Sequence, residues 1–285
     1  MNILKINKLY FLGPEGTYCQ QAMKRFAEEK NIKADNIIPK TPITAILQAV
    51  DKDENAMAVL PIENSIEGIV RETIDNLVKL KDSNVKIIGE TVIPISHCLM
   101  TKANDIKKIK HVLSHPQALG QCSGYICENL KGVDVTETHS TGEAARLAAQ
   151  KGETYAAIAA SPAAEISNLN ILARQINDEK DNKTRFILVA RGIQNPTGND
   201  KTSIFFTVKN EPGSLAKVLN IFNEHNINLM YIESRPSRKK MGEYNFCVDL
   251  EGHITDKNIQ TAMVSVEKMT NKIIITGSYP QFSEK

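Results

Sequence analysis

The fold is decided by the stretch Lys8-Leu9-Tyr10-Phe11-Leu12-Gly13-Pro14-Glu15-Gly16-Thr17-Tyr18 near the N-terminus. Its apolar run over 8–12 predicts a strand, and the Gly and Pro residues that follow predict a turn. Thr17 is a suitable N-cap for a helix after the turn, with Gln20 reaching back to the cap. Strand, turn and helix together form one unit, and this unit recurs along the chain.

The recurrence extends to about residue 190. Further apolar runs begin at Ala56, His111, Val133 and Tyr155, and each is followed by a polar turn and by apolar residues at helical spacing. Strands that alternate with helices are typical of α/β proteins with mainly parallel sheets. In such sheets the strand-to-helix loops gather at one edge, where helix N-termini offer free N–H groups to anions. The repeated unit therefore predicts an α/β fold with a cleft suited to a small carboxylate.

The pattern changes after residue 190. A polar segment with Gly and Pro over 191–201 lacks periodicity, which indicates a linker. Beyond it, the expected strands and helices follow the order βαββαβ, which is the ferredoxin-like split unit. We therefore predict a first domain over 8–190, a linker over 191–201 and a second domain over 202–280.

Composition excludes several classes of protein. The 285 residues include 35 Lys and Arg and 33 Asp and Glu, a formal net charge of +2, which gives no electrostatic reason for nucleic-acid or anionic-membrane binding. No apolar run approaches the ~20 residues that span a bilayer, and the N-terminus lacks the apolar region of a signal peptide. The five Cys include no C-x-x-C pair and do not suggest a disulfide framework. We therefore expect a cytoplasmic protein that binds neither nucleic acid nor membrane.

Short motifs in both domains resemble known signatures. Those in the first domain resemble the prephenate dehydratase family, in the family's order: Gly13-Pro14-Glu15-Gly16-Thr17-Tyr18, Pro61-Ile62-Glu63-Asn64-Ser65-Ile66-Glu67-Gly68, Ser114-His115-Pro116-Gln117-Ala118-Leu119 with Gln121-Cys122, Ser140-Thr141 before Ala144-Ala145, and Asn182-Lys183-Thr184-Arg185-Phe186. Those in the second resemble the amino-acid-binding segments of an ACT regulatory domain: Glu211-Pro212-Gly213-Ser214-Leu215 and Glu233-Ser234-Arg235-Pro236. The resemblance covers about residues 8–280. Because no chorismate mutase segment precedes Lys8, we expect the stand-alone form.

The resemblance implies a fold, a reaction and partners. The implied fold has two α/β subdomains, similar to a periplasmic binding protein, with the active site in the cleft between them. In the implied reaction, prephenate loses carbon dioxide and its ring hydroxyl and becomes phenylpyruvate, the step towards phenylalanine. The implied effector is L-phenylalanine, and the implied assembly is a homodimer or homotetramer held through ACT domains.

The chemistry of this reaction limits which groups the site needs. Hydroxide is a poor leaving group unless it is protonated, so the site needs a strong hydrogen-bond donor at the ring hydroxyl and fixed donors for the side-chain carboxylate. Since nothing in the chain resembles a metal cluster or a P-loop, we expect neither a metal nor a cofactor. From the resemblance we assign catalytic roles to Thr184, Glu63 and Asn64. Glu63 stays open to two interpretations, as a proton donor or as the partner of a helix dipole.

The resemblance also assigns binding residues. The predicted substrate-binding residues are Thr17, Ser114, Gln121, Ser140, Thr141, Arg185 and Phe186. The predicted phenylalanine-binding residues are Gly213, Ser214, Leu215, Glu233, Ser234, Arg235 and Pro236. Arg185 is suited to clamp a carboxylate, with a solvated or an internally salt-bridged Arg185 as the alternatives, and Ser114 is equally compatible with an ordinary helix cap.

Two alternative functions remain open on the sequence. Arogenate dehydratase performs the same chemistry on the amino-acid analogue of prephenate. A carboxylate or amino-acid sensor without catalytic activity is the second alternative, because both folds also occur as binding modules. The presence of Thr184 in an otherwise complete set of motifs favours an enzyme.

Overall fold

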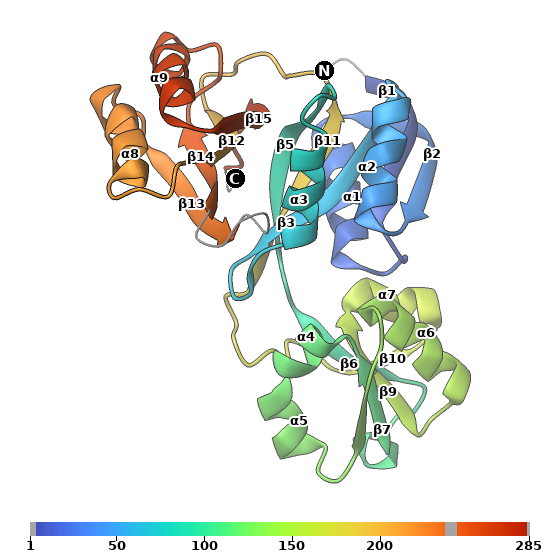
Figure 1. The fold of residues 1–285 in the computed structure, drawn as a ribbon. Helices are drawn as coiled ribbons and strands as arrows, with labels where there is room; N and C mark the ends of the chain where they lie inside the picture. The colour runs from blue at the N-terminus through green and yellow to red at the C-terminus, as the bar shows by residue number, and fades with distance from the viewer. Residues whose placement is uncertain (1–3, 237–243, 284–285) are drawn as a thin grey trace. The chain divides into compact units, whose positions relative to one another are not determined.

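The computed structural model describes residues 4–236 and 244–283, drawn in colour in Figure 1. The chain is an α/β protein that divides into two compact units, each assembled from separate segments. The first unit takes its described residues from Met1–Ile46, Val59–Val70 and Thr91–Phe186. The second takes them from Leu47–Ala58, Arg71–Glu90 and Ile187–Lys285. No helix within 4–236 and 244–283 is long and apolar enough to cross a membrane.

The first unit begins with the strand, turn and helix that the opening stretch predicts. Strand β1 (Leu4–Leu12) pairs in parallel with β2 (Ile32–Lys40), and helix α1 (Tyr18–Glu29) connects them. Thr17 is the N-cap of α1, and its hydroxyl oxygen accepts from the backbone N–H of Gln20 at 3.4 Å. The Gln20 side chain accepts from Gly16 N at 2.8 Å, so Gln20 reaches back as predicted but bonds to the residue before the cap.

A second sheet in this unit has the strand order β10-β6-β9-β7-β8. Its strands are β6 (His97–Thr101), β7 (His111–Ser114), β8 (Asp134–Glu137), β9 (Tyr155–Ala160) and β10 (Asn170–Ala173). Its helices are η1 (Ile106–Lys108), α4 (Pro116–Gly120), α5 (Ser123–Asn129), α6 (Thr141–Lys151) and α7 (Ser161–Ser167). Strand β7 pairs in parallel with β8 and β9, as the repeated unit predicts. Strands β6 and β10 are antiparallel additions, so the expectation of mainly parallel sheets is only partly met.

Three long strands contribute residues to both units. They are β3 (Ala56–Asn64), β5 (Val85–Pro94) and β11 (Lys183–Arg191). A short strand, β4 (Gly68–Ile69), pairs with the end of β3. The helices next to these strands in sequence are α2 (Ile43–Lys52) and α3 (Arg71–Lys79). Strands β11, β3, β1 and β2 are neighbours in that order, which brings the ends of β3 and β11 together.

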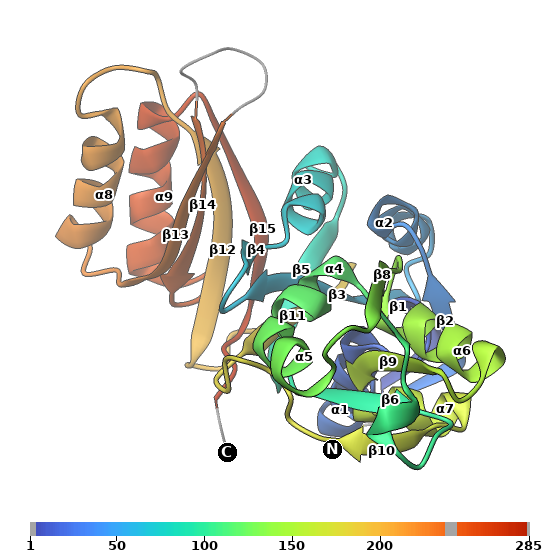
Figure 2. The ribbon, with the colours of Figure 1, turned by 90° about the horizontal axis from the view of Figure 1, so that it is seen from below.

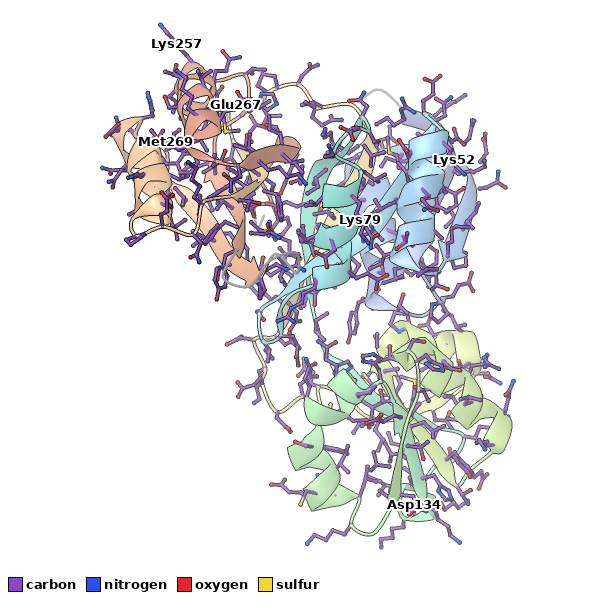
Figure 3. All side chains as sticks on the ribbon, viewed as in Figure 1. Lys52, Lys79, Asp134, Lys257, Glu267 and Met269 are labelled. Atoms are coloured by element: carbon purple, nitrogen blue, oxygen red, sulfur yellow. The ribbon has the colours of Figure 1, made fainter. Side chains whose placement is uncertain are left out.

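The predicted βαββαβ order is confirmed in the second unit. Its elements are β12 (Asp200–Thr207), α8 (Ser214–Glu224), β13 (Leu229–Pro236), β14 (Tyr244–Glu251), α9 (Lys257–Met269) and β15 (Lys272–Pro280). The strands form an antiparallel sheet in the order β13-β14-β12-β15, and both helices cover one face of it (Figure 2). Phe206, Phe222 and Val266 are buried in the core between helices and sheet, whereas Lys257 and Glu267 of α9 point outward (Figure 3).

Within the second unit, strand β15 of this sheet pairs with β5 and contacts α3. Strand β15 pairs in parallel with β5 at Gly277 and Ile87, where a Cβ on residue 277 would lie 2.4 Å from the Ile87 carbonyl oxygen. Only glycine allows so close an approach of two backbones. A buried ion pair supports the contact, because Lys201 Nζ donates to both carboxylate oxygens of Glu90 at 2.9 and 3.0 Å.

Candidate active site

A chain of hydrogen bonds joins five polar side chains of the first unit: His97, Gln121, Asn182, Asn64 and Thr184. Asn64 ends β3, while Asn182 and Thr184 stand at the start of β11. The Nδ2 atom of Asn64 lies 2.8 Å from Thr184 Oγ1 and 2.7 Å from Asn182 Oδ1. Asn182 Nδ2 lies 2.9 Å from Gln121 Oε1, and His97 Nε2 lies 3.3 Å from the same oxygen. Residues far apart in sequence thus form one continuous network.

The backbone after β3 fixes the direction of these hydrogen bonds. Asn64 Oδ1 accepts from the N–H groups of Ile66 at 3.1 Å and Glu67 at 3.0 Å, so the Nδ2 group of Asn64 is the donor towards its other partners. Thr184 Oγ1 is therefore an acceptor from Asn64, and the hydroxyl hydrogen of Thr184 has no acceptor among the residues that the structure describes. Asn64 and Thr184 are 6% and 8% exposed, and low exposure to water strengthens a hydrogen bond. The arrangement makes Thr184 a directed donor.

Glu63 and Arg185 form an ion pair beside this network. Arg185 Nε donates to Glu63 Oε2 at 2.9 Å, and the two side chains are 29% (Glu63) and 11% (Arg185) exposed. Of the interpretations that the sequence left open, the structure shows the internal salt bridge for Arg185. Because successive strand residues point to opposite faces, this pair lies on the other side of β3 and β11 from Asn64 and Thr184.

Three other predicted substrate-binding residues lie at helix starts or in the core. The hydroxyl of Ser114 is fully buried and donates to the Ile158 carbonyl oxygen, and the helix that follows is capped by His115 instead. Phe186 is 2% exposed and belongs to the core. Thr17 caps α1 and also donates to the Pro14 carbonyl oxygen at 3.0 Å. None of these three joins the hydrogen-bond network described above.

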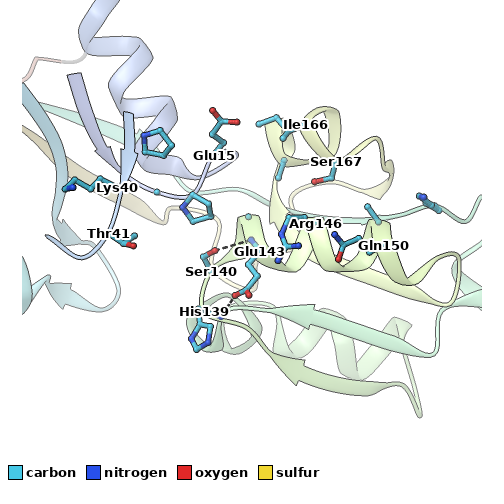
Figure 4. Close-up of a pocket in the computed structure, with 17 residues that line it drawn as sticks. Glu15, Lys40, Thr41, His139, Ser140, Glu143, Arg146, Gln150, Ile166 and Ser167 are labelled. Carbon is cyan, nitrogen blue, oxygen red and sulfur yellow. Dashed lines mark hydrogen bonds between the residues drawn. The ribbon is translucent and has the colours of Figure 1, made fainter. Parts of the chain in front are cut away.

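Ser140 and Thr141 lie at the start of α6, next to a cavity of about 1120 Å³ (Figure 4). Ser140 Oγ accepts from Glu143 N at 3.1 Å, and Glu143 accepts from His139 N at 2.9 Å. The cavity is lined by Ser140 and by the loop 13–15, but not by Thr184, Asn64 or Gln121. Its lining therefore brings the start of α6 together with the turn that follows β1.

Two members of the network were not assigned a role from the sequence. Asn182 belongs to a quoted motif, and its position two residues before Thr184 was a usable signal. His97 belongs to no motif, and its only signal in the sequence is a polar residue directly before the apolar run Cys98-Leu99-Met100. Burial lowers the pKa of His97 to about 4, so its imidazole is neutral at neutral pH.

The predicted effector-binding segments lie towards the same ends of their strands in the second unit. Thr207 at the end of β12 and Arg235 near the end of β13 both pair with Asn245 of β14. Gly213 is the N-cap of α8 with a φ of 79°, and Ser214 and Leu215 begin that helix. The segment 213–215 therefore follows the end of β12, and the segment 233–236 forms the end of β13 on the same side of the sheet.

The side chain of Arg235 forms an ion pair with helix α3. Its Nη2 atom lies 2.7 Å from Asp75 Oδ1 on α3, and its side chain is 8% exposed. Its Nη1 atom is buried and has no hydrogen-bond partner among the residues that the structure describes. Glu233 accepts from the hydroxyl of Tyr231. A buried guanidinium with one unused donor group is suited to an additional carboxylate.

Comparisons with known proteins agree with these features. The family model described as Prephenate dehydratase matches residues 9–194, and that of the ACT domain matches residues 202–268. The prephenate dehydratase of Methanocaldococcus jannaschii is 42% identical over 276 residues, which cover 94% of this chain and 96% of that protein. The bifunctional chorismate mutase/prephenate dehydratase of Aquifex aeolicus is 40% identical over 281 residues, which cover 99% of this chain and 75% of that protein.

The fold of the chain also matches that of a solved structure. The crystal structure of the prephenate dehydratase from Arthrobacter aurescens in complex with L-Phe superposes with a TM-score of 0.85 at 32% identity, covering 96% of this chain and 90% of that one. The motifs, the paired domains and these relatives lead to one conclusion. The chain belongs to the prephenate dehydratase family.

Proposed function

We propose that this prephenate dehydratase uses the Thr184 hydroxyl to assist departure of the ring hydroxyl of prephenate. The observation that carries the proposal is the 2.8 Å hydrogen bond from Asn64 Nδ2 to Thr184 Oγ1. Because Asn64 donates, the hydrogen of Thr184 is free for the oxygen that leaves the substrate. A donor placed where negative charge develops lowers the barrier of the reaction.

The proposed reaction breaks two bonds of prephenate. The bond between the ring carbon and its carboxylate breaks, and its electron pair moves into the ring, which becomes aromatic. The carbon–oxygen bond at the opposite ring carbon breaks at the same time, and the departing oxygen takes up one proton and leaves as water. The products are phenylpyruvate, carbon dioxide and water. Thr184 stabilises the departing oxygen, and no step requires an oxidant or a reductant.

Gln121 is the proposed donor to a substrate carboxylate. Its Oε1 atom is occupied by Asn182 and His97, while its Nε2 atom is buried without a hydrogen-bond partner among the described residues. Such a donor gains a hydrogen bond when an anion binds, instead of exchanging one. Ser140 and Thr141 add the positive end of helix α6. In this proposal Glu63 keeps Arg185 in place, and Thr17, Ser114 and Phe186 shape the surrounding backbone.

L-Phenylalanine is the proposed allosteric effector, bound by the segments 213–215 and 233–236. The unused Nη1 group of Arg235 and the start of α8 offer donors to its carboxylate. The Arg235–Asp75 ion pair then links the effector site to α3. The functional division into 8–190, 191–201 and 202–280, and a cytoplasmic location, belong to the same proposal.

A homodimer or homotetramer is proposed to form through the ACT domains. Strand β13 lies at the edge of its sheet, where its backbone is open to pairing. It exposes Met230 and Ile232, which are 37% and 44% exposed. Apolar side chains on an edge strand favour association with a second copy.

Incubation of the purified chain with prephenate tests the catalytic proposal. We expect phenylpyruvate to form, as measured by its ultraviolet absorbance in alkali, and we expect arogenate to be converted to phenylalanine more slowly or not at all. Preferential conversion of arogenate would contradict the substrate assignment. Binding of prephenate in calorimetry without turnover of either compound would instead support the sensor alternative.

A further inference from the structure

His97 is a buried histidine that the proposed mechanism does not use directly. It begins β6, is 3% exposed, and its Nε2 atom lies 3.3 Å from Gln121 Oε1. Its Nδ1 atom is buried and has no hydrogen-bond partner within the described part of the chain. A neutral imidazole carries its hydrogen on either Nδ1 or Nε2. For His97 the hydrogen-bonding partner of Nε2 decides which of the two nitrogens is protonated.

The network imposes that tautomer one residue at a time. The amide of Asn64 donates through Nδ2, because its oxygen already accepts from two backbone N–H groups. Asn182 Oδ1 must then accept from Asn64, which leaves Asn182 Nδ2 to donate to Gln121 Oε1. Since Gln121 Oε1 is an acceptor, the hydrogen of the His97 ring must be on Nε2.

The backbone and Tyr18 hold the ring in this orientation. His97 N donates to Asn177 Oδ1 at 2.6 Å, and Ile176 N donates to the His97 carbonyl oxygen at 3.0 Å. The edge of the ring meets Tyr18, with centroids 5.7 Å apart and planes at 76°. The Tyr18 hydroxyl donates to the Ser96 carbonyl oxygen at 2.7 Å, which fixes the aromatic ring in turn.

We infer that His97 is a positioning residue for Gln121: as the neutral Nε2–H tautomer it holds the Gln121 oxygen and so directs the Gln121 amide Nε2–H₂ group towards the substrate. Because both His97 and Asn182 donate to the Gln121 oxygen, the Gln121 amide has a single favourable orientation. Without His97 the amide loses one of these two donors and gains freedom to rotate. The inference rests on the proposed role of Gln121 in binding substrate.

The first arm of the test measures binding of prephenate by calorimetry, so it does not depend on turnover. His97→Met, which has similar volume and no donor, is expected to weaken prephenate binding about tenfold, since a directed buried hydrogen bond is lost. His97→Gln offers an N–H donor at a position similar to that of Nε2 and is expected to stay within about threefold of wild type. Equal losses in both variants would overturn the inference.

Combining His97→Met with a substitution at Gln121 distinguishes a positioning role of His97 from a general structural one. In a Gln121→Met background, His97→Met is expected to cause no further loss of prephenate binding, because it acts through Gln121. A further loss of similar size in that background would show that His97 acts independently. If prephenate binds to wild type but is not turned over, the proposed catalysis fails while this comparison still decides the role of His97.

The second arm observes the wild-type ring directly, and a variant serves only to assign its signal. Long-range ¹⁵N–¹H spectra of the histidine-labelled, substrate-free protein report which ring nitrogen carries the hydrogen. We expect one histidine with the pattern of a neutral Nε2–H ring, and its loss in His97→Gln assigns it. A His97 ring protonated on Nδ1, or on both nitrogens, at neutral pH would overturn the inference.

Discussion

Thr184→Ala is expected to lower kcat for phenylpyruvate formation about 10²–10⁴-fold, while prephenate still binds. The hydroxyl of Thr184 is needed chiefly in the transition state, where the departing oxygen becomes negative. The variant removes this donor from a site in which Thr184 is 8% exposed, so water does not readily replace it. Steady-state measurements of kcat and KM, with circular dichroism to confirm folding, check this result.

Two further variants separate the hydroxyl from the shape of the side chain. Thr184→Val keeps the branched shape without a hydroxyl and should be as impaired as Thr184→Ala. Thr184→Ser keeps the hydroxyl and should retain kcat within about tenfold of wild type. A near-normal kcat in Thr184→Ala would exclude the proposed role of this residue.

A second large effect is expected on the binding of L-phenylalanine to the second unit. An effector coupled by ~1–3 kcal/mol changes prephenate affinity ~5–150-fold, and prephenate must change phenylalanine affinity by the same factor. Gly213 caps α8 with a φ of 79°, a conformation that a β-branched residue adopts only with strain. We therefore expect Gly213→Val to weaken phenylalanine binding at least tenfold in calorimetry, since ~1–3 kcal/mol of strain distorts the site.

Gly198→Val is the matched control for this experiment. Gly198 also has a positive φ, 88°, and in both positions a Cβ would meet nothing within 4 Å. It lies in the segment 191–201, outside the proposed effector site. Similar backbone strain there should leave phenylalanine binding unchanged. Equal weakening in both variants, or no binding to wild type at millimolar phenylalanine, would contradict the regulatory proposal.

Local features of the fold follow from the sequence because their causes are local. The strand and turn before Thr17 depend on neighbours within a few residues, and so does the cap of α1. The βαββαβ order of the second unit follows from apolar periodicity in the same way. The antiparallel strands β6 and β10 were not predicted, since their pairing is set by contacts between distant segments.

The site was only partly predictable for the same reason. The resemblance assigned catalytic roles to Asn64 and Thr184, but the donor in their hydrogen bond is decided by backbone N–H groups two and three residues after Asn64. For Arg185, a substrate clamp, a salt bridge and a solvated side chain all stayed open, because the outcome depends on the position of Glu63 across two strands. His97 was missed altogether, since its role comes from Gln121, 24 residues away.

In the proposed mechanism Asn64 acts by directing the hydroxyl of Thr184. Asn64→Asp keeps an oxygen for the N–H groups of Ile66 and Glu67 but removes the Nδ2 donor, and its carboxylate would accept the hydrogen of Thr184 instead.

A double-mutant cycle on kcat, with Asn64→Asp, Thr184→Ala and both together, measures whether Asn64 acts through Thr184. We expect Asn64→Asp to lower kcat in the wild-type background and to have little further effect once Thr184 is alanine. Losses in kcat that multiply in the double variant would contradict this role of Asn64.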